Sequence, residues 1–365
     1  MTKLTARTAS DVQDALSATA PALRLLPVAG ATKPALSSSA RDDVALLDVS
    51  GLRGIVGYDP AELTLTALAG TPVHELEATL REHGQYLPFD PPLAAAGATI
   101  GGVVAAGTSG SGAWRYGGVR DFVLGVRFVD GTGRLISAGG RVVKNAAGFD
   151  VPKLMVGSIG RLGIMVELSL KVFPRAPATV TLEFALGDAG AAVEAVAALG
   201  RAPIQLDALD IAPGGRLLAR LAGRPGELDA RAERLLRFVA SAATNLQGAD
   251  ERELWRRVQD PSAGGGTDTA VRASSTLGTI VALDEALAAW PGAVAHYAVG
   301  GTLAWIRWPR AAALDELDGL LTELDLTGMV LAGPPDRPLI GRRAGGEFGR
   351  RVARGIDPDS RFLEL

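Results

Sequence analysis

The sequence predicts an α+β protein with two domains, and three observations lead to this class. The chain of 365 residues is long enough for two separate hydrophobic cores. Strand-like segments, in which apolar and polar residues alternate, and segments with helical spacing follow one another along the chain. A proline-rich link at residues 174–177 separates two such series. We therefore place a domain boundary at this link.

The first domain is expected to begin with a small α/β unit. Residues 10–20 have the pattern of a capped helix, and residues 23–28 and 44–49 have that of short buried strands. Near the end of this domain, residues 150–156 have helical spacing and residues 164–173 alternate as a strand does.

A further helix is expected after Thr71. Threonine is a common N-cap and proline suits the first helical position, so Thr71 and Pro72 predict a helix start. Apolar residues at helical spacing follow, and Gly84 is expected to end the helix.

The second domain is predicted to be a series of strands and helices. We expect strands at residues 179–186, 216–222, 303–308 and 329–332, and helices at residues 187–200, 227–246 and 311–324. Glycines at 264–266, followed by residues 267–269, predict a flexible connection.

Composition excludes several classes of function. The 37 basic and 40 acidic residues nearly balance, without a basic tract, which argues against nucleic acid as a partner. The absence of cysteine excludes disulfides, iron–sulfur clusters and cysteinyl flavin links within the chain. The three histidines do not have zinc-site spacing, so no metal site is expected. Because no apolar run approaches the roughly 18 residues of a membrane span, we expect no transmembrane segment and a cytoplasmic location.

Two glycine-dense runs indicate a nucleotide cofactor. Residues 97–118 contain eight glycines, which let a backbone approach phosphate oxygens closely. In the second run, Gly157, Gly160 and Gly163 are spaced somewhat like a dinucleotide fingerprint. That fingerprint requires a strand before it and a helix after it, whereas here the predicted order is reversed. The sequence therefore argues against a Rossmann fold.

These runs belong to a series of motifs that resembles a known family. In chain order the motifs are PVAGATKP at 27–34, DPP at 90–92, ATIGG at 98–102, GVRDFVLG at 118–125, KNAAGFD at 144–150 and GSIGRLGI at 157–164. The series resembles the FAD-binding fold of the vanillyl-alcohol oxidase and p-cresol methylhydroxylase (PCMH) type. Within that type it is most similar to the smaller, FAD-binding subunits of bacterial glycolate oxidase.

The resemblance implies a domain organisation and a cofactor. It implies a PCMH-type FAD-binding domain over residues 1–175, an α+β cap domain over 176–335, and a C-terminal segment, 336–365, that returns to the FAD domain. FAD is expected to bind without a covalent link, because residues 27–34 hold no histidine or tyrosine and the chain has no cysteine.

The resemblance also implies which residues contact FAD. The turn at residues 30–33 would offer backbone N–H groups to the diphosphate, although an ordinary surface turn is the alternative. Alanine at position 31 disfavours the positive φ that glycine permits. The implied cofactor contacts are Gly30, Ala31, Thr32, Lys33, Pro91, Pro92, Gly97, Ala98, Thr99, Gly101, Gly102, Ser109, Gly110, Tyr116, Gly117, Asp121, Lys144, Gly148, Asp150, Gly157, Gly160, Gly163 and Ile164.

Catalytic residues are harder to assign. The larger subunits of this family carry a His-x-x-Gly-Asp-Gly-Asn-x-His motif, of which the stretch from His296 keeps the glycines and one histidine. Oxidation of a 2-hydroxy acid needs a cation for the carboxylate, and Arg272 is the candidate because it lies among small residues.

The resulting expectation is an FAD-dependent oxidoreductase. The chain would be the FAD-binding subunit of a glycolate oxidase or dehydrogenase complex, beside a larger catalytic FAD subunit and an iron–sulfur subunit. Any membrane association is expected to come through that complex. Two alternatives stay open: a non-catalytic assembly subunit with a relic flavin site, and a standalone FAD-dependent 2-hydroxy-acid dehydrogenase.

Overall fold

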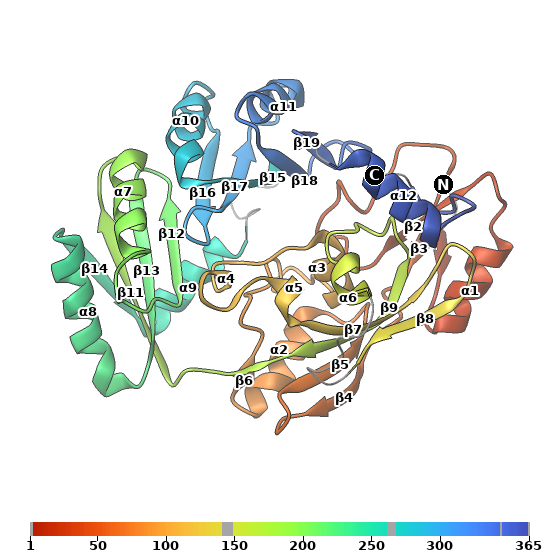
Figure 1. Cartoon of the computed structure of the whole chain (residues 1–365), viewed down its shortest axis with the longest axis horizontal. Helices are drawn as coiled ribbons and strands as arrows, with labels where there is room; N and C mark the ends of the chain where they lie inside the picture. The colour runs from red at the N-terminus through yellow and green to blue at the C-terminus, as the bar shows by residue number, and fades with distance from the viewer. Residues whose placement is uncertain (1–2, 141–148, 261–267, 344, 364–365) are drawn as a thin grey trace. The chain divides into compact units, whose positions relative to one another are not determined.

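The structure, a computed structural model, describes residues 3–140, 149–260, 268–343 and 345–363 (Figure 1). The chain divides into two compact units, each built of helices and strands, and the predicted α+β class is confirmed. Unit 1 comprises Met1–Ser109, Gly118–Pro174 and Ala344–Leu365, and unit 2 comprises Gly110–Gly117 and Arg175–Arg343. The domain limits expected at residues 175 and 335 stay predictions.

Two sheets form the frame of unit 1. The strands of a parallel sheet, in spatial order, are β1 (Lys3–Thr5), β3 (Val44–Asp48) and β2 (Arg24–Val28). Those of an antiparallel sheet are β4 (Ile55–Asp59), β5 (Thr64–Leu68), β9 (Ile164–Lys171), β7 (Val123–Val129) and β8 (Leu135–Gly139). A separate antiparallel pair consists of β6 (Gln85–Tyr86) and β10 (Phe173–Pro174).

The two sheets of unit 1 share a core with the first helix. The helices of this unit are α1 (Ala9–Ala18), α2 (Val73–Glu82), α3 (Ile100–Ala106), α5 (Val119–Phe122), α6 (Val151–Met155) and α12 (Gly346–Ile356). Leu16 of α1, Leu47 of β3 and Ile164 of β9 are buried in one cluster. Phe362 lies in the same cluster and pairs with Leu25 of β2, so the C-terminal residues contribute to this core.

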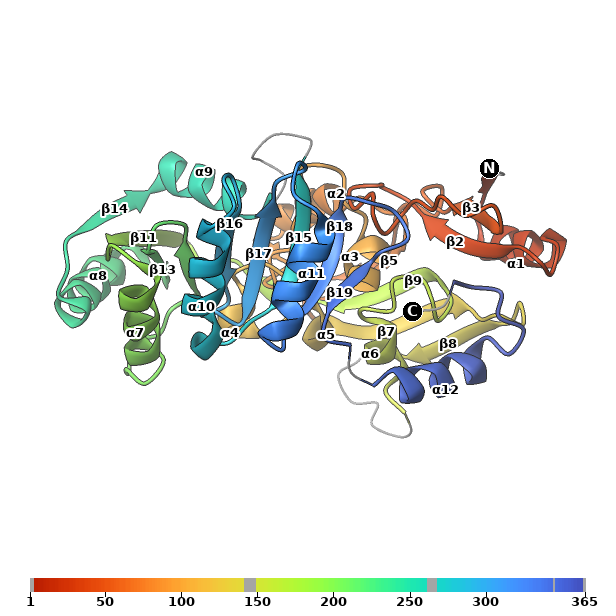
Figure 2. The ribbon, with the colours of Figure 1, turned by 90° about the horizontal axis from the view of Figure 1, so that it is seen from above.

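A nine-stranded antiparallel sheet forms the frame of unit 2. Its strands, in spatial order, are β14 (Ala243–Gln247), β11 (Ala178–Ala185), β13 (Arg216–Gly223), β12 (Ala208–Ala212), β16 (Val294–Ala298), β17 (Leu303–Trp308), β15 (Thr269–Ser274), β18 (Thr327–Ala332) and β19 (Leu339–Gly341). Its helices are α4 (Ala113–Tyr116), α7 (Ala189–Leu199), α8 (Pro225–Val239), α9 (Gly248–Val258), α10 (Leu277–Ala288) and α11 (Leu314–Glu323). Figure 2 shows α7, α10 and α11 along one face of this sheet. Trp255 of α9 packs with Ala208 and Ala212 of β12.

The helix expected over residues 227–246 is shorter than predicted. Helix α8 ends at Val239, and Ala240 takes a left-handed φ of 53° while its N–H bonds to the carbonyl of Leu236. Residues Ala243–Gln247 instead form β14, whose backbone groups pair with β11 at the edge of the sheet. A ladder with a neighbouring strand overrides the helical pattern here.

One other local prediction was also wrong. Thr71 does not cap α2, because its hydroxyl donates to the carbonyls of Leu68 and Gly54, and Pro72 occupies the N-cap. The flexible connection expected at 264–269 lies outside the described residues except for Asp268 and Thr269, and Thr269 begins β15.

Candidate functional site

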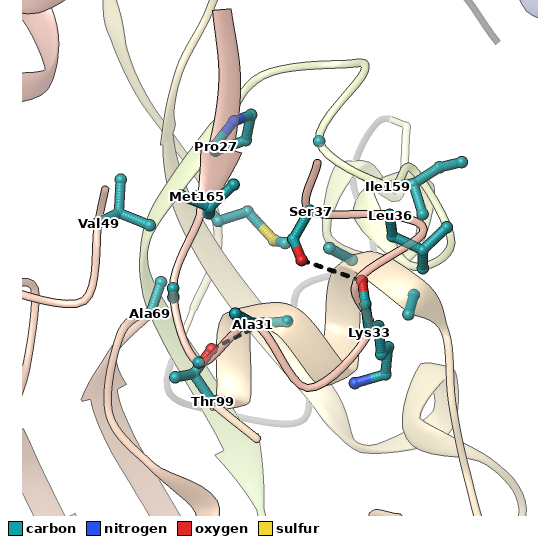
Figure 3. Close-up of a pocket in the computed structure, with 18 of the residues that line it drawn as sticks. Pro27, Ala31, Lys33, Leu36, Ser37, Val49, Ala69, Thr99, Ile159 and Met165 are labelled. Atoms are coloured by element: carbon teal, nitrogen blue, oxygen red, sulfur yellow. Dashed lines mark hydrogen bonds between the residues drawn. The ribbon is translucent and has the colours of Figure 1, made fainter. Parts of the chain in front are cut away.

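A cavity that opens to solvent lies within unit 1. Its walls come from the loop after β2, from α3 and from the segment that leads into β9 (Figure 3). The lining residues are Pro27, Val28, Ala29, Gly30, Ala31, Thr32, Lys33, Leu36, Ser37, Val49, Ala69, Thr99, Gly101, Gly102, Ala105, Ala106, Ile159, Gly160, Gly163 and Met165.

The loop after β2 presents backbone donors that have no acceptor. Within the described part of the chain, the N–H groups of Gly30, Ala31, Thr32 and Lys33 make no hydrogen bond. Ala31 takes a left-handed φ of 49°, so the turn keeps a conformation that normally favours glycine. A Cβ at Gly30 would collide with the carbonyl oxygen of Gly97, so position 30 requires glycine. Neighbouring free N–H groups of this kind are typical of anion-binding loops.

Lys33 is a buried cation in this cavity. Its side chain is 6% exposed and makes no ion pair with any described residue. Burial lowers the pKa of its ammonium from 10.5 to about 8. Figure 3 draws Lys33 on the same loop as Ala31.

The two glycines at the start of α3 have different surroundings. The N–H of Gly101 donates to the carbonyl of Ala69 at 2.8 Å, and a Cβ at Gly101 would lie 2.7 Å from the same oxygen. A Cβ at Gly102 would meet only the hydroxyl of Thr99, at 3.2 Å. Gly101 therefore permits the packing of α3 against the backbone at Ala69, whereas Gly102 leaves space beside the cavity.

Two buried hydroxyls near α3 lack partners. Within the described residues, the Oγ1 of Thr108 and the Oγ of Ser158 are buried without a hydrogen bond. The segment that carries Ser158 is held to α3, because the N–H of Ile159 donates to the carbonyl of Ala105 at 2.8 Å. Ile159 has a φ of 43°, which is strained for a β-branched residue. Such orphaned hydroxyls fit a polar ligand beside this segment.

The residues expected to contact the cofactor divide into groups. Those that line the cavity are Gly30, Ala31, Thr32, Lys33, Thr99, Gly101, Gly102, Gly160 and Gly163. Those of unit 1 that do not line it are Pro91, Pro92, Gly97, Ala98, Ser109, Asp121, Asp150, Gly157 and Ile164. Gly110, Tyr116 and Gly117 group with unit 2, and Lys144 and Gly148 lie outside the described residues.

Three of the polar residues that do not line the cavity have local structural roles. Ser109 accepts a hydrogen bond from the N–H of Val119 at 2.8 Å. Asp121 and Asp150 accept bonds from backbone N–H groups at the starts of α5 and α6. The apolar lining residues, such as Leu36 and Met165, were not predicted, because an apolar residue has no sequence signature that separates a cavity wall from a core.

The candidate substrate cation, Arg272, lies on β15 of unit 2. Its strand neighbours are Trp305 on β17 and Met329 on β18. Burial lowers the pKa of its guanidinium, and its Nε is buried without a hydrogen bond within the described residues. An arginine keeps its charge even when buried, so Arg272 can bind a carboxylate.

The degenerate histidine motif forms a hydrogen-bonded cluster around Asp210. This carboxylate is fully buried, and its Oδ2 lies 2.8 Å from the Nε2 of His296. It also accepts bonds from the hydroxyl of Ser111 and, at 3.1 Å, from the N–H of Val299. His296 is thereby engaged by a buried carboxylate within its own unit.

The same cluster holds the segment Gly110–Gly117, which contains α4. Arg115 and Tyr116 both bind Asp207, and the ring of Trp114 lies where a Cβ of Gly300 would be. Together with the bond from Ser111 to Asp210, these contacts attach the segment to β12 and to the turn between β16 and β17. Within the described residues, no three histidine, aspartate or glutamate side chains gather to hold a metal ion.

The cavity and its free donors have the features of an anion site, and the comparisons indicate the class of protein. Residues 3–139 match the family described as "FAD binding domain". This match supports FAD as the cofactor. Over 136 residues the chain is 51% identical to glycolate oxidase subunit GlcE of Escherichia coli. This match covers 37% of this chain and 39% of that protein.

Other relatives also match part of the chain. A D-2-hydroxyglutarate dehydrogenase of Xanthomonas citri pv. viticola is 32% identical over 194 residues, 53% of this chain and 40% of that protein. Glycolate oxidase subunit GlcD of Bacillus subtilis is 34% identical over 128 residues, 35% of this chain and 27% of that protein. The matches with the first two relatives thus span about two fifths of their length.

A solved structure confirms the fold over the whole chain. The chain superimposes on an alkyldihydroxyacetonephosphate synthase with a TM-score of 0.73 and 16% identity, covering 100% of this chain and 77% of that one. This likeness establishes the fold alone. In the described ranges, no helix has the length and apolar character that crossing a bilayer requires.

Proposed function

We propose that this chain is an FAD-dependent oxidoreductase subunit that takes part in oxidising a small 2-hydroxy acid, glycolate to glyoxylate. The observation that carries the proposal is the loop at residues 30–33, whose free N–H groups lie beside the buried Lys33 in a domain whose family binds FAD. The names of the relatives, a glycolate oxidase subunit and a 2-hydroxy-acid dehydrogenase, support the substrate class.

The residues of the proposed site would have distinct tasks. The N–H groups of residues 30–33, which line the cavity, would bind the diphosphate of FAD. Bound FAD supplies an acceptor for the two electrons that leave the C–H bond of the hydroxy acid. Arg272 would bind the substrate carboxylate. FAD would be held without a covalent link, since no cysteine is present and residues 27–34 contain no histidine or tyrosine.

The partners belong to the same proposal. The chain would work beside a larger catalytic FAD subunit and an iron–sulfur subunit, which would pass the electrons on. The hydrogen bond between His296 and Asp210 supports the need for a catalytic partner subunit. It binds the one histidine that the degenerate motif retains to a carboxylate of the same unit. Without cysteine, the chain cannot itself carry an iron–sulfur cluster.

A co-expression experiment tests the proposed function. The purified chain should be yellow, and acid precipitation should release all of the flavin. Alone it should reduce a dye with glycolate slowly or not at all, whereas the set co-expressed with the neighbouring subunits should co-elute and be active. In the active set, Arg272→Met should raise the KM for glycolate at least about tenfold.

Two results would contradict the proposal in different ways. A chain that stays colourless after incubation with FAD would indicate an assembly subunit with a relic site. A lone chain that oxidises glycolate as fast as the co-expressed set would indicate a standalone dehydrogenase.

A further inference from the structure

We infer that the Lys33 ammonium binds a phosphate group of FAD, so that this site selects phosphorylated flavins and takes up a proton when FAD binds at alkaline pH. The inference rests on FAD as the cofactor and does not depend on the oxidation of glycolate.

The buried ammonium of Lys33 has no counter-ion within the described part of the chain. Buried charges in proteins are normally paired, because moving an unpaired ammonium out of water is costly. Lys33 is 6% exposed, and no acidic side chain among the described residues bonds to it. Among the residues that the structure describes, no other lining residue of the cavity, from the loop after β2, from α3 or from the segment leading into β9, is charged or titratable. An anionic ligand is therefore the partner that this cation requires.

The hydrogen-bond donors around Lys33 suit a phosphate group. Phosphate oxygens accept several hydrogen bonds at once, and here the N–H groups of residues 30–33 are free beside the same cavity. A glycine at position 30 brings this backbone close to Gly97 without a side chain between them. One cation and a run of N–H donors match a phosphate ester better than the uncharged ring system of a flavin.

Binding of a phosphate at Lys33 is coupled to protonation of its amine. Without ligand, burial holds the pKa of Lys33 near 8. An adjacent phosphate favours the charged amine and raises that pKa. Below pH 8 the amine is already protonated in the free protein, so the affinity for FAD should be constant. Above pH 8 binding must first add a proton, so the affinity should fall by up to about tenfold for each pH unit.

The test measures dissociation constants of the apoprotein by quenching of flavin fluorescence, with FAD and with riboflavin, which has no phosphate. At pH 7, Lys33→Met should weaken FAD binding about 10- to 100-fold, as expected for loss of a charged hydrogen bond. Riboflavin binding should change less than twofold. Lys171→Met is the matched control, because Lys171 lies on β9 of the same unit and does not line the cavity. It should leave both constants unchanged.

The pH dependence supplies a second readout that needs no variant. The affinity of the unaltered protein for FAD should decline from pH 8 to pH 10, and that of Lys33→Arg should stay level, because arginine remains charged. The inference is overturned if Lys33→Met binds FAD as tightly as the unaltered protein, if it loses FAD and riboflavin equally, or if the unaltered protein shows no decline. Failure of the unaltered protein to bind FAD at any pH would overturn the cofactor assignment as well.

Discussion

At the scale of single residues, Gly101 and Gly102 show how neighbouring glycines serve different purposes. Gly101 allows α3 to approach the carbonyl of Ala69, and Gly102 leaves room at the cavity. A side chain at the first position therefore disturbs packing, and one at the second position fills space that a ligand would use.

This difference predicts that substitution of Gly102 affects FAD binding, whereas substitution of Gly101 affects stability. Gly102→Val should abolish FAD binding and leave the chain folded, as measured by flavin absorbance and circular dichroism. Gly101→Ala should lower the free energy of unfolding by about 1–3 kcal/mol through overpacking. Gly319→Val is the control, because a Cβ at Gly319 of α11 meets no atom within 4 Å. A yellow Gly102→Val variant would show that the cofactor lies elsewhere.

Lys33 predicts a pH dependence of stability in the apoprotein. Its pKa is about 8 when folded and 10.5 in its ordinary state, so between these values the unfolded chain binds more protons. The free energy of unfolding should therefore rise with pH across this window, by about 3 kcal/mol in total from this group. Below pH 8 its full destabilising effect is present.

The check is urea unfolding of the apoprotein at intervals from pH 7 to pH 10.5. Lys33→Met should be more stable than the unaltered protein at pH 7, and the difference should shrink toward pH 10.5. Parallel stability curves for the two proteins would contradict the burial of a charged amine at this position.

Sequence reasoning at this scale found polar and glycine positions of the cavity wall and missed apolar ones. Thr99 and Gly160 belong to recognisable motifs, and both line the cavity. Met165 looks like any other residue of an alternating strand, and its place at the cavity follows from how β9 lies beside α3. The left-handed conformation of Ala31 could not be predicted either. It is unfavourable for alanine, and contacts elsewhere in the fold stabilise it.

At the scale of elements, local patterns located several helices and strands, left others such as β7, β12 and α10 unassigned, and misjudged some ends. The run from residue 97 reads as a glycine-dense loop, yet it contains α3, capped by Thr99 and ended by Gly107 in the left-handed conformation. Val103, Val104 and Ala106 bury enough apolar surface to form this helix despite two internal glycines. Such tertiary burial is not visible in the local sequence.

The cluster around Asp210 predicts the stability of unit 2. Replacing Asp210 by Asn removes the carboxylate to which His296, Ser111 and the N–H of Val299 are hydrogen-bonded. Because hydrogen bonds to a buried charged group are strong, Asp210→Asn should lower the free energy of unfolding by about 2–3 kcal/mol, measured in urea. Asp268→Asn, at a more exposed carboxylate with a long 3.9 Å ion pair, should change it by less than about 0.5 kcal/mol. Equal changes in the free energy of unfolding for the two variants would show that the cluster around Asp210 does not stabilise unit 2.

At the scale of the whole molecule, the co-linear series of motifs predicted the fold class and the cofactor. The order of the motifs along residues 27–164 carried that information, since each alone also occurs in unrelated loops. The grouping of Gly110–Gly117 with unit 2 was not predictable, because its anchors, Asp207 and Asp210, lie almost a hundred residues further along the chain.

That grouping has a consequence for how such a protein can be recombined. A gene crossover at the link after Pro174 would transfer Asp207 and Asp210 but would leave Ser111 and Arg115 in the other parent. A chimera with a cap from a distant relative should therefore need residues 110–117 from the same donor as the cap. The eight-residue segment and the sheet that holds it are inherited as one unit, although the FAD-binding sequence surrounds the segment on both sides.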